Sequence, residues 1–241
     1  GENRMNAATD WVRKVETVIA GAHAEGRRQL YEHEVYAILS ELQIRTPRHL
    51  LVRSERDVSQ ATLALFGTER IVLKIVSPSA PHKQKLGVVK TVYKDLDFVR
   101  YSVREMVGSF KDRGLAVEGV LLAEYVAYSK DLGNEILLGF RESAAFGPVI
   151  SFSKGGTDAE HFAAHFSPPN LMLLPLDREW ASALQASTHI QKKYLNEGKE
   201  GYISKIVDTE VKLSDLAVHF SSFFRQPGAG RFVLTEFEIN P

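Results

Sequence analysis

Three oxygen-bearing side chains alternate along the last apolar stretch of the chain, RFVLTEFEINP. Glu236, Glu238 and Asn240 are spaced by two residues, so on an extended strand they point to the same face. Two carboxylates on one face repel each other unless a cation lies between them. An all-oxygen set suits Mg²⁺, which proteins usually hold with one or two carboxylates and substrate phosphates. The spacing therefore indicates either a magnesium site or a solvated acidic strand.

A lysine interrupts the apolar run RIVLKIV of residues 70–76. The Lys74 ammonium is costly to bury without an anionic partner, unless the side chain reaches water at the strand edge. The loop that follows, SPSAPHKQKLG, combines prolines, His82 and two more lysines with a glycine. Such a loop beside a strand lysine can lie over phosphates, and a histidine there can accept a phosphoryl group. The alternative for His82 is an ordinary surface histidine.

The composition limits the classes of function. Thirty basic and thirty acidic residues balance in a chain of 241 residues, so the overall charge gives no attraction to nucleic acid or to an anionic membrane. The absence of cysteine excludes disulfides, thiolate metal sites and cysteine nucleophiles. No stretch approaches the ~18 apolar residues of a membrane span. We therefore expect a cytoplasmic protein whose anion site is local, without a Walker or G-x-G-x-x-G motif.

Helical and strand periods alternate from end to end, which favours an α/β or α+β fold. We expect helices around residues 11–19 and 35–42, one that begins at the Ser54 capping box, and others over about 97–110, 177–195 and 210–224. Strands are expected over 48–52, at both ends of 70–93, and over 231–241. The runs VEGVLLAEYV, NEILLGFR and GPVISFS are expected to form three adjacent strands.

Five segments together resemble a known family. In the order VLKIVSPSAPHKQKLGVVK, VEGVLLAEYV, NEILLGF, FGPVISFSKGG and TEFEINP, the chain is similar to the ATP-grasp domain of NDP-forming acyl-CoA synthetases. This family includes ADP-forming acetate–CoA ligase and is related to succinyl-CoA synthetase. The resemblance implies an α+β ATP-grasp fold over residues 28–241, after an N-terminal helical extension of residues 1–27. It also implies a small lid of about residues 46–121 that closes over Mg-ATP on a larger body of residues 28–45 and 122–241.

The resemblance assigns the phosphate chemistry to basic side chains. Lys74 matches the strand lysine that contacts the nucleotide phosphates, and Lys90 follows on the next strand. His82 matches the loop histidine that relays a phosphoryl group between the ATP site and the site of acyl-CoA formation. Arg141 is the candidate for an active-site arginine, because the family's usual Phe-Arg pair is replaced in this chain.

The resemblance also implies where the nucleotide and the metal bind. Residues Glu124, Tyr125 and Val126 match the hinge whose backbone pairs with the adenine edge, and Glu135 matches a glutamate near the ribose or the phosphates. The magnesium ligands are Glu238 and Asn240, with Glu236 beside them.

Two departures keep other functions open. Where the family reads H-K-S-D-x-G-G-V, this chain reads HKQKLGVV, so Lys85 replaces an aspartate and Val88 a glycine. A nucleotide-binding or regulatory module without turnover is one alternative. An ATP-grasp ligase that joins a carboxylate to an amine is another, because the lid and magnesium residues would serve it equally well and it needs no histidine carrier.

The family's activity requires more than this sequence. Family members continue beyond the position of Pro241, so we expect a fragment or a disordered tail. A CoA-binding and acyl-transfer domain or subunit, which handles the small carboxylic acid and CoA, is expected as the partner of an ADP-forming acid–CoA ligase.

Overall fold

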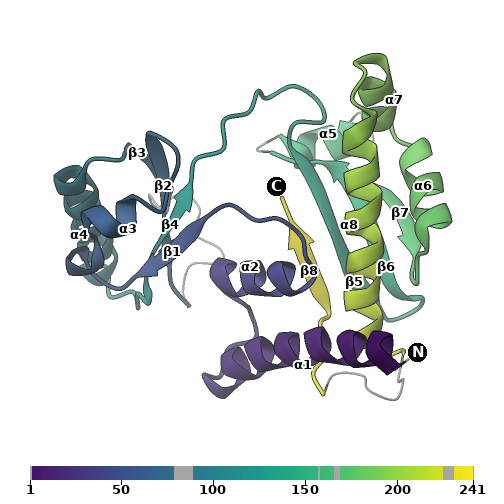
Figure 1. Cartoon of the computed structure of the whole chain (residues 1–241), viewed down its shortest axis with the longest axis horizontal. Coiled ribbons are helices and arrows are strands. Elements are labelled where there is room, and N and C mark those ends of the chain that lie inside the picture. The colour runs from purple at the N-terminus through teal and green to yellow at the C-terminus, as the bar shows by residue number, and fades with distance from the viewer. Residues whose placement is uncertain (1, 79–88, 157, 166–168, 225–230, 241) are drawn as a thin grey trace. The chain divides into compact units, whose positions relative to one another are not determined.

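The computed structural model describes residues 2–78, 89–156, 158–165, 169–224 and 231–240. The chain divides into two compact units (Figure 1). The smaller unit is Thr17–Ala127, and the larger unit joins Gly1–Glu16 to Tyr128–Pro241. The boundary between them falls within helix α1, Glu2–Ala24. The lid expected at about residues 46–121 lies inside the smaller unit, which also includes helix α2, Glu32–Glu41.

The smaller unit is built on an antiparallel sheet of order β1-β4-β2-β3. Its strands are β1 His49–Val52, β2 Arg70–Val76, β3 Val89–Tyr93 and β4 Gly119–Glu124. Its remaining helices are η1 Glu55–Asp57, α3 Gln60–Leu63 and α4 Leu96–Lys111. The two strands predicted at the ends of residues 70–93 are therefore confirmed as β2 and β3.

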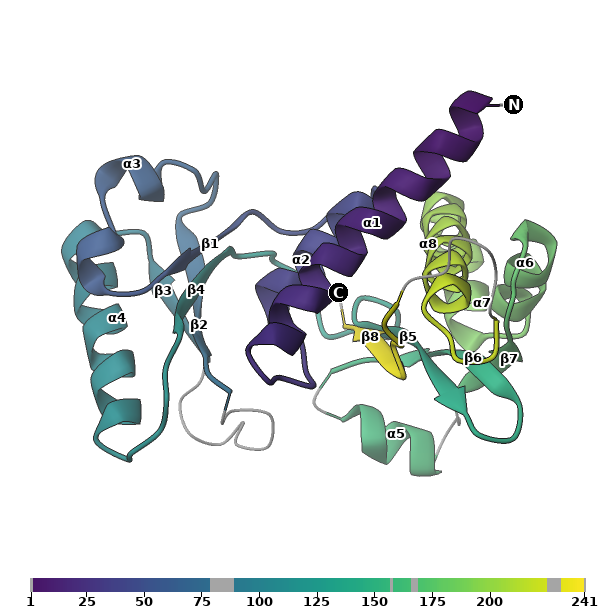
Figure 2. The same cartoon turned by 90° about the horizontal axis from the view of Figure 1, so that it is seen from below.

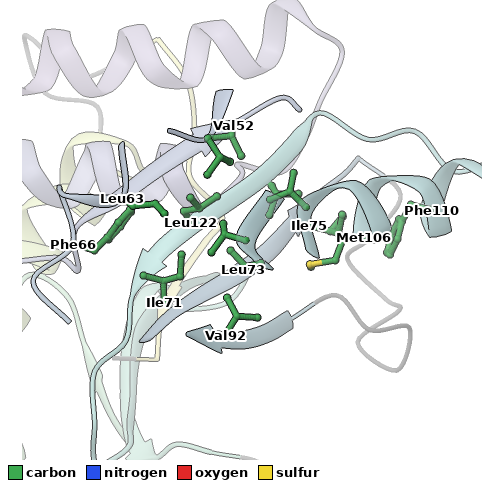
Figure 3. Packing of buried hydrophobic residues seen from close by; sticks show 14 residues of the cluster. Val52, Leu63, Phe66, Ile71, Leu73, Ile75, Val92, Met106, Phe110 and Leu122 are labelled. Carbon is green, nitrogen blue, oxygen red and sulfur yellow. The ribbon is translucent and has the colours of Figure 1, made fainter. Parts of the chain in front are cut away.

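Alternation along β2 separates the two faces of this sheet. Ile71, Leu73 and Ile75 point to one face and are nearly inaccessible to solvent. Helix α4 covers that face with an apolar stripe that ends at Met106 and Phe110, as Figure 3 shows. Lys74 lies on the opposite face because it falls between two core positions. The second face therefore carries Lys74 next to apolar residues of β4, since Leu121 lies opposite Lys74 and is fully buried.

The larger unit contains an antiparallel sheet of order β7-β6-β5-β8. Its strands are β5 Ile136–Ser143, β6 Gly147–Lys154, β7 Asn170–Leu173 and β8 Glu236–Ile239. Its helices are α5 Ala159–His165, α6 Arg178–Ala186, α7 His189–Asn196 and α8 Glu200–His219. Helix α8 crosses β5 and β6 on one face of the sheet (Figures 1 and 2).

Three features of these elements differ from the prediction. β4 pairs with β1 and β2 in the smaller unit, so the expectation of three adjacent strands is wrong. The helix expected over 177–195 is two helices, because Ser187 ends α6 and the Thr188 hydroxyl caps α7 by accepting from the Gln191 amide. The helix expected from the Ser54 capping box is only the short turn η1, and Ser59 caps α3 separately.

Other predicted helices differ only in length. α8 begins at Glu200, ten residues earlier than expected, and ends at His219. Strand β7 and helix α5 were not predicted. None of the helices in the described ranges is long and apolar enough to cross a membrane.

Candidate functional site

The acidic residues of β8 lie on the sheet face that α8 leaves open. Phe237 is 4% exposed and its ring stacks on that of Phe140, with centroids 5.8 Å apart. Glu236 and Glu238 alternate with Phe237, so they point away from this packed layer. In the register of β5 with β8, Glu236 lies opposite Arg141 and Glu238 lies opposite Gly139. The structure therefore brings three of the predicted site residues together.

This face is hollowed. A cavity of about 420 Å³ is lined by the strands β5, β6, β7 and β8, including Arg141, Ser151, Glu236 and Glu238. Leu171 and Phe146, which also line it, are 63% and 71% exposed. Ligand sites commonly combine apolar walls with a few placed polar groups. The cavity therefore suits a ligand with a charged part and an apolar part.

The Glu236 carboxylate affects the ionisation of Glu238. Partial burial and the neighbouring Glu236 carboxylate raise the pKa of Glu238, and Arg141 opposes this shift. A cation between the carboxylates would relieve the repulsion. No group of three His, Cys, Asp or Glu side chains within the described ranges could hold a metal ion. The two carboxylates thus fit Mg²⁺ as part of its ligand set, and amide and phosphate oxygens would complete the coordination.

Two consecutive glycines bring Asn240 and Glu135 to the same end of the sheet. A Cβ on Gly155 would collide with Asn240 Oδ1 and would lie 2.8 Å from the Ile136 carbonyl oxygen. A Cβ on Gly156 would collide with Glu135 Oε2. The Gly155 amide also donates to the Glu135 carbonyl, 2.9 Å away. The role of these glycines was not predicted, although a Gly-Gly pair directly after a strand was a usable signal.

Glu135 is held by its own loop and by α7. The Tyr128 hydroxyl donates to Glu135 Oε1 at 2.7 Å. Two residues upstream, the Gly133 carbonyl accepts from the Tyr194 hydroxyl of α7, and the Leu132 carbonyl accepts from Lys193 Nζ at 2.7 Å. Helix α7 therefore fixes the loop that precedes Glu135.

The described partner of Lys74 is a carboxylate of its own unit. Lys74 Nζ donates to Glu32 Oε1 of α2 at 2.5 Å. Lys90 lies opposite Leu73 in the register of β2 with β3, so it shares the face of the core and not the face of Lys74. The structure therefore does not bring the two predicted phosphate lysines together.

The predicted hinge follows the end of β4. Glu124 is the last residue of this strand, and its amide donates to the Arg48 carbonyl at 2.8 Å. Tyr125 and Val126 lie beyond the strand, and Val126 is 55% exposed. His82, with Lys85 and Val88, falls within residues 79–88, outside the described part of the chain. Its role stays a prediction.

The chain is similar to a known domain family and to a known ligase subunit. A family model described as an ATP-grasp domain matches residues 21–241. The β subunit of acetate–CoA ligase [ADP-forming] I from Pyrococcus furiosus is 26% identical over 239 residues, which cover 96% of this chain and 92% of that protein.

Two solved structures are similar in fold. ACD1 of Candidatus Korarchaeum cryptofilum in complex with coenzyme A is 25% identical, with a TM-score of 0.74 over 94% of this chain and 92% of that chain. Dinucleotide-forming acetyl-coenzyme A synthetase 1 from the same organism, in complex with coenzyme A, acetyl-coenzyme A and a phosphorylated phosphohistidine segment, is also 25% identical. Its TM-score is 0.69, over 85% of this chain and 86% of that chain.

Proposed function

Because the chain belongs to the ATP-grasp domain family, we propose that it binds Mg-ATP and supplies the nucleotide-binding part of an ADP-forming acid–CoA ligase. The observation that carries this proposal is the family match over residues 21–241, in which the acidic strand β8 is included. The fold predicted from the sequence, α+β with an ATP-grasp architecture, is confirmed by this match and by the likeness to ACD1.

Magnesium would be held by Glu238 and Asn240, with Glu236 beside them. Burial and, after it, repulsion by the Glu236 carboxylate raise the pKa of Glu238, and a bound cation would relieve both costs of ionisation, which supports this role. When bound, the ion neutralises phosphate charge. Arg141 lies opposite Glu236 on the same face and would contact the phosphates, while Glu135 would contact the ribose or the phosphates. Backbone groups of residues 124–126 would pair with the adenine edge.

The reaction would be reversible phosphoryl transfer. A ring nitrogen of His82 attacks the γ-phosphorus of ATP, the bond to the bridging oxygen breaks, and ADP leaves. The phosphohistidine then passes its phosphoryl group to a carboxylic acid, and CoA displaces phosphate from the acyl phosphate. The last steps belong to a CoA-binding partner. The Korarchaeum synthetase that carries a phosphohistidine segment supports this role for a histidine.

Labelling of the full chain tests the proposal. Incubation with γ-labelled ATP and magnesium is expected to leave acid-labile label on wild type and none on His82→Ala. Gln84→Ala, in the same loop, is the matched control and is expected to label normally. Equal labelling of wild type and His82→Ala would remove the carrier role.

The altered loop favours a second candidate. Lys85 and Val88 replace an aspartate and a glycine of the related motif, and a β-branched residue does not readily adopt the backbone conformations of glycine. A nucleotide-binding module without turnover would bind Mg-ATP and leave His82 unlabelled.

A further inference from the structure

Lys74 lies on the second face of the smaller sheet and contacts α2. Its ammonium donates to Glu32 Oε1 at 2.5 Å, and the two side chains remain 28% and 37% exposed. One turn further along α2, the Tyr36 ring packs on His49 of β1, with centroids 4.7 Å apart. These polar and aromatic contacts lie beside an apolar residue of the same face, because Leu121 is opposite Lys74 in the register of β2 with β4 and is fully buried.

The Glu32 carboxylate is fixed from several sides. Its Oε1 accepts from both Lys74 Nζ and the Tyr36 hydroxyl. Glu32 is also the first residue of a ten-residue helix, where the helix dipole favours a negative charge. Burial and the adjacent Glu32 raise the pKa of Tyr36, so its hydroxyl keeps its proton and acts as the donor. The carboxylate thus has little freedom to turn away from Lys74.

We propose that Glu32 is a positioning residue that holds the Lys74 ammonium ready for a nucleotide phosphate, and that Tyr36 fixes Glu32 for this task. The inference rests on the proposed binding of Mg-ATP, and it takes Lys74 as the phosphate contact that the family resemblance implies. An ammonium has three donors, and Glu32 uses one, so two remain for phosphate oxygens. Ordering a lysine side chain costs conformational entropy. Because the ion pair with Glu32 already orders Lys74, ATP binding does not have to supply that free energy.

A rival interpretation predicts a change of ATP affinity in the opposite direction. If Glu32 competed with ATP for Lys74, removal of its charge would tighten binding. Three substitutions separate charge from geometry. Glu32→Asp keeps the charge but withdraws the carboxylate by one methylene. Glu32→Gln keeps the length and an acceptor oxygen but loses the charge, and Tyr36→Phe changes no charge and removes only the hydroxyl.

Equilibrium binding of Mg-ATP and of adenosine to the full chain provides the test. Glu32→Asp and Tyr36→Phe are expected to weaken ATP binding about three- to tenfold, the penalty for ordering one long side chain on binding. Glu32→Gln is expected to stay within about twofold of wild type, because its carbonyl oxygen still orients the ammonium. Adenosine binding should not change, whereas a general loss of structure would weaken it. Glu105→Gln, exposed on α4, is the charge control.

The outcomes distinguish this inference from the proposed function. ATP binding by Glu32→Asp and Tyr36→Phe at wild-type strength, with a loss in Lys74→Met, would overturn the positioning role alone. Tighter binding by Glu32→Gln would establish competition instead. A wild type that does not bind Mg-ATP would overturn the proposed function and this inference together, whereas a Lys74→Met variant that binds it normally would overturn this inference alone.

Discussion

Glu238 links the chemistry of the acidic strand to a measurable pH dependence. Its pKa is raised by partial burial and by Glu236, so its ionised form is disfavoured in the folded protein. The stability that the protonated Glu238 contributes is fully present below 4.5, the ordinary pKa of a glutamate side chain, and is lost as pH rises through the raised pKa of the folded protein. Without magnesium, Glu238→Gln is therefore expected to melt at a higher temperature than wild type at neutral pH, with the difference vanishing in acid.

The same variant tests the metal role. With Mg-ATP present, Glu238→Gln is expected to bind at least about tenfold more weakly, because a lost charge-assisted contact is worth ~1.5–3 kcal/mol. Calorimetric titration with and without magnesium measures both effects. Glu179→Gln, exposed on α6, serves as the control. Unchanged magnesium dependence in Glu238→Gln would exclude it as a ligand.

At the residue scale, local spacing was predictable and distant pairing was not. The period of two along RFVLTEFEINP placed Glu236 and Glu238 on one face, as β8 has them. The Glu32 partner of Lys74 lies 42 residues away in the sequence, and no pattern in either segment identifies the other. The cost of an isolated ammonium indicated that an anion was needed but not which one.

Gly139 determines how closely β8 approaches β5. A Cβ at this position would collide with the Phe237 carbonyl oxygen and would lie 2.8 Å from Glu238 Cα. Because both contacts are backbone, Gly139→Ala is expected to displace β8, with a loss of stability of ~1–3 kcal/mol and weaker Mg-ATP binding. Thermal melting and nucleotide titration measure the two effects.

The matched control for this substitution is Gly21→Ala. Gly21 lies within α1, and a Cβ there would meet no atom within 4 Å. Alanine is favoured over glycine in a helix by ~1 kcal/mol, so this variant should gain stability and keep its nucleotide affinity. A Gly139→Ala variant that gained stability in the same way would contradict the described close approach of the strands.

A buried carboxyl group of α8, that of Glu210, contacts α6. Glu210 is fully buried, its Oε1 accepts from Gln185 Nε2 at 2.5 Å, and its Oε2 has no hydrogen-bond partner among the described atoms. Burial raises the pKa of Glu210 from 4.5 to about 8. The stability of wild type should therefore fall as pH rises from about 4.5 to about 8, because the carboxyl ionises in the unfolded chain while it stays protonated in the folded one, and should level off above about 8.

Glu210→Gln mimics the protonated side chain. It is expected to melt at nearly constant temperature from pH 6 to 9 and to be more stable than wild type at pH 7 by ~1–3 kcal/mol, the order given by the pKa difference. Melting curves across this range test the prediction. Parallel curves for both proteins would show that Glu210 does not titrate as described.

At the scale of elements, hydrophobic periods identified most helices and strands but not their ends. Residues 178–195 keep one helical stripe, so periodicity alone predicted a single helix. Thr188 ends this continuity, since its hydroxyl donates to the Gln185 carbonyl while accepting from the Gln191 amide. Serine and threonine compete with helix backbone in this way, and whether they break a helix depends on the tertiary contacts of both halves.

At the scale of the whole molecule, the sequence predicted the class of fold but not the membership of each sheet. The apolar run of β4 is followed closely by β5 and β6, yet β4 completes the sheet of the smaller unit. Strands buried on both faces show no alternation that specifies a neighbour. Family resemblance supplied the ATP-grasp assignment that periodicity could not.

The smaller unit contains its own buried apolar cluster. The fourteen residues of this cluster lie between Val52 and Leu122, within Thr17–Ala127, and α4 packs on its own sheet over them (Figure 3). Residues 17–127 expressed alone are therefore expected to unfold in one cooperative transition. Leu73→Ala should cost this fragment ~2–5 kcal/mol, whereas Val89→Ala, at a position 57% exposed, should cost little. Urea unfolding followed by circular dichroism measures both, and a broad transition equally insensitive to the two changes would show that the core needs the rest of the chain.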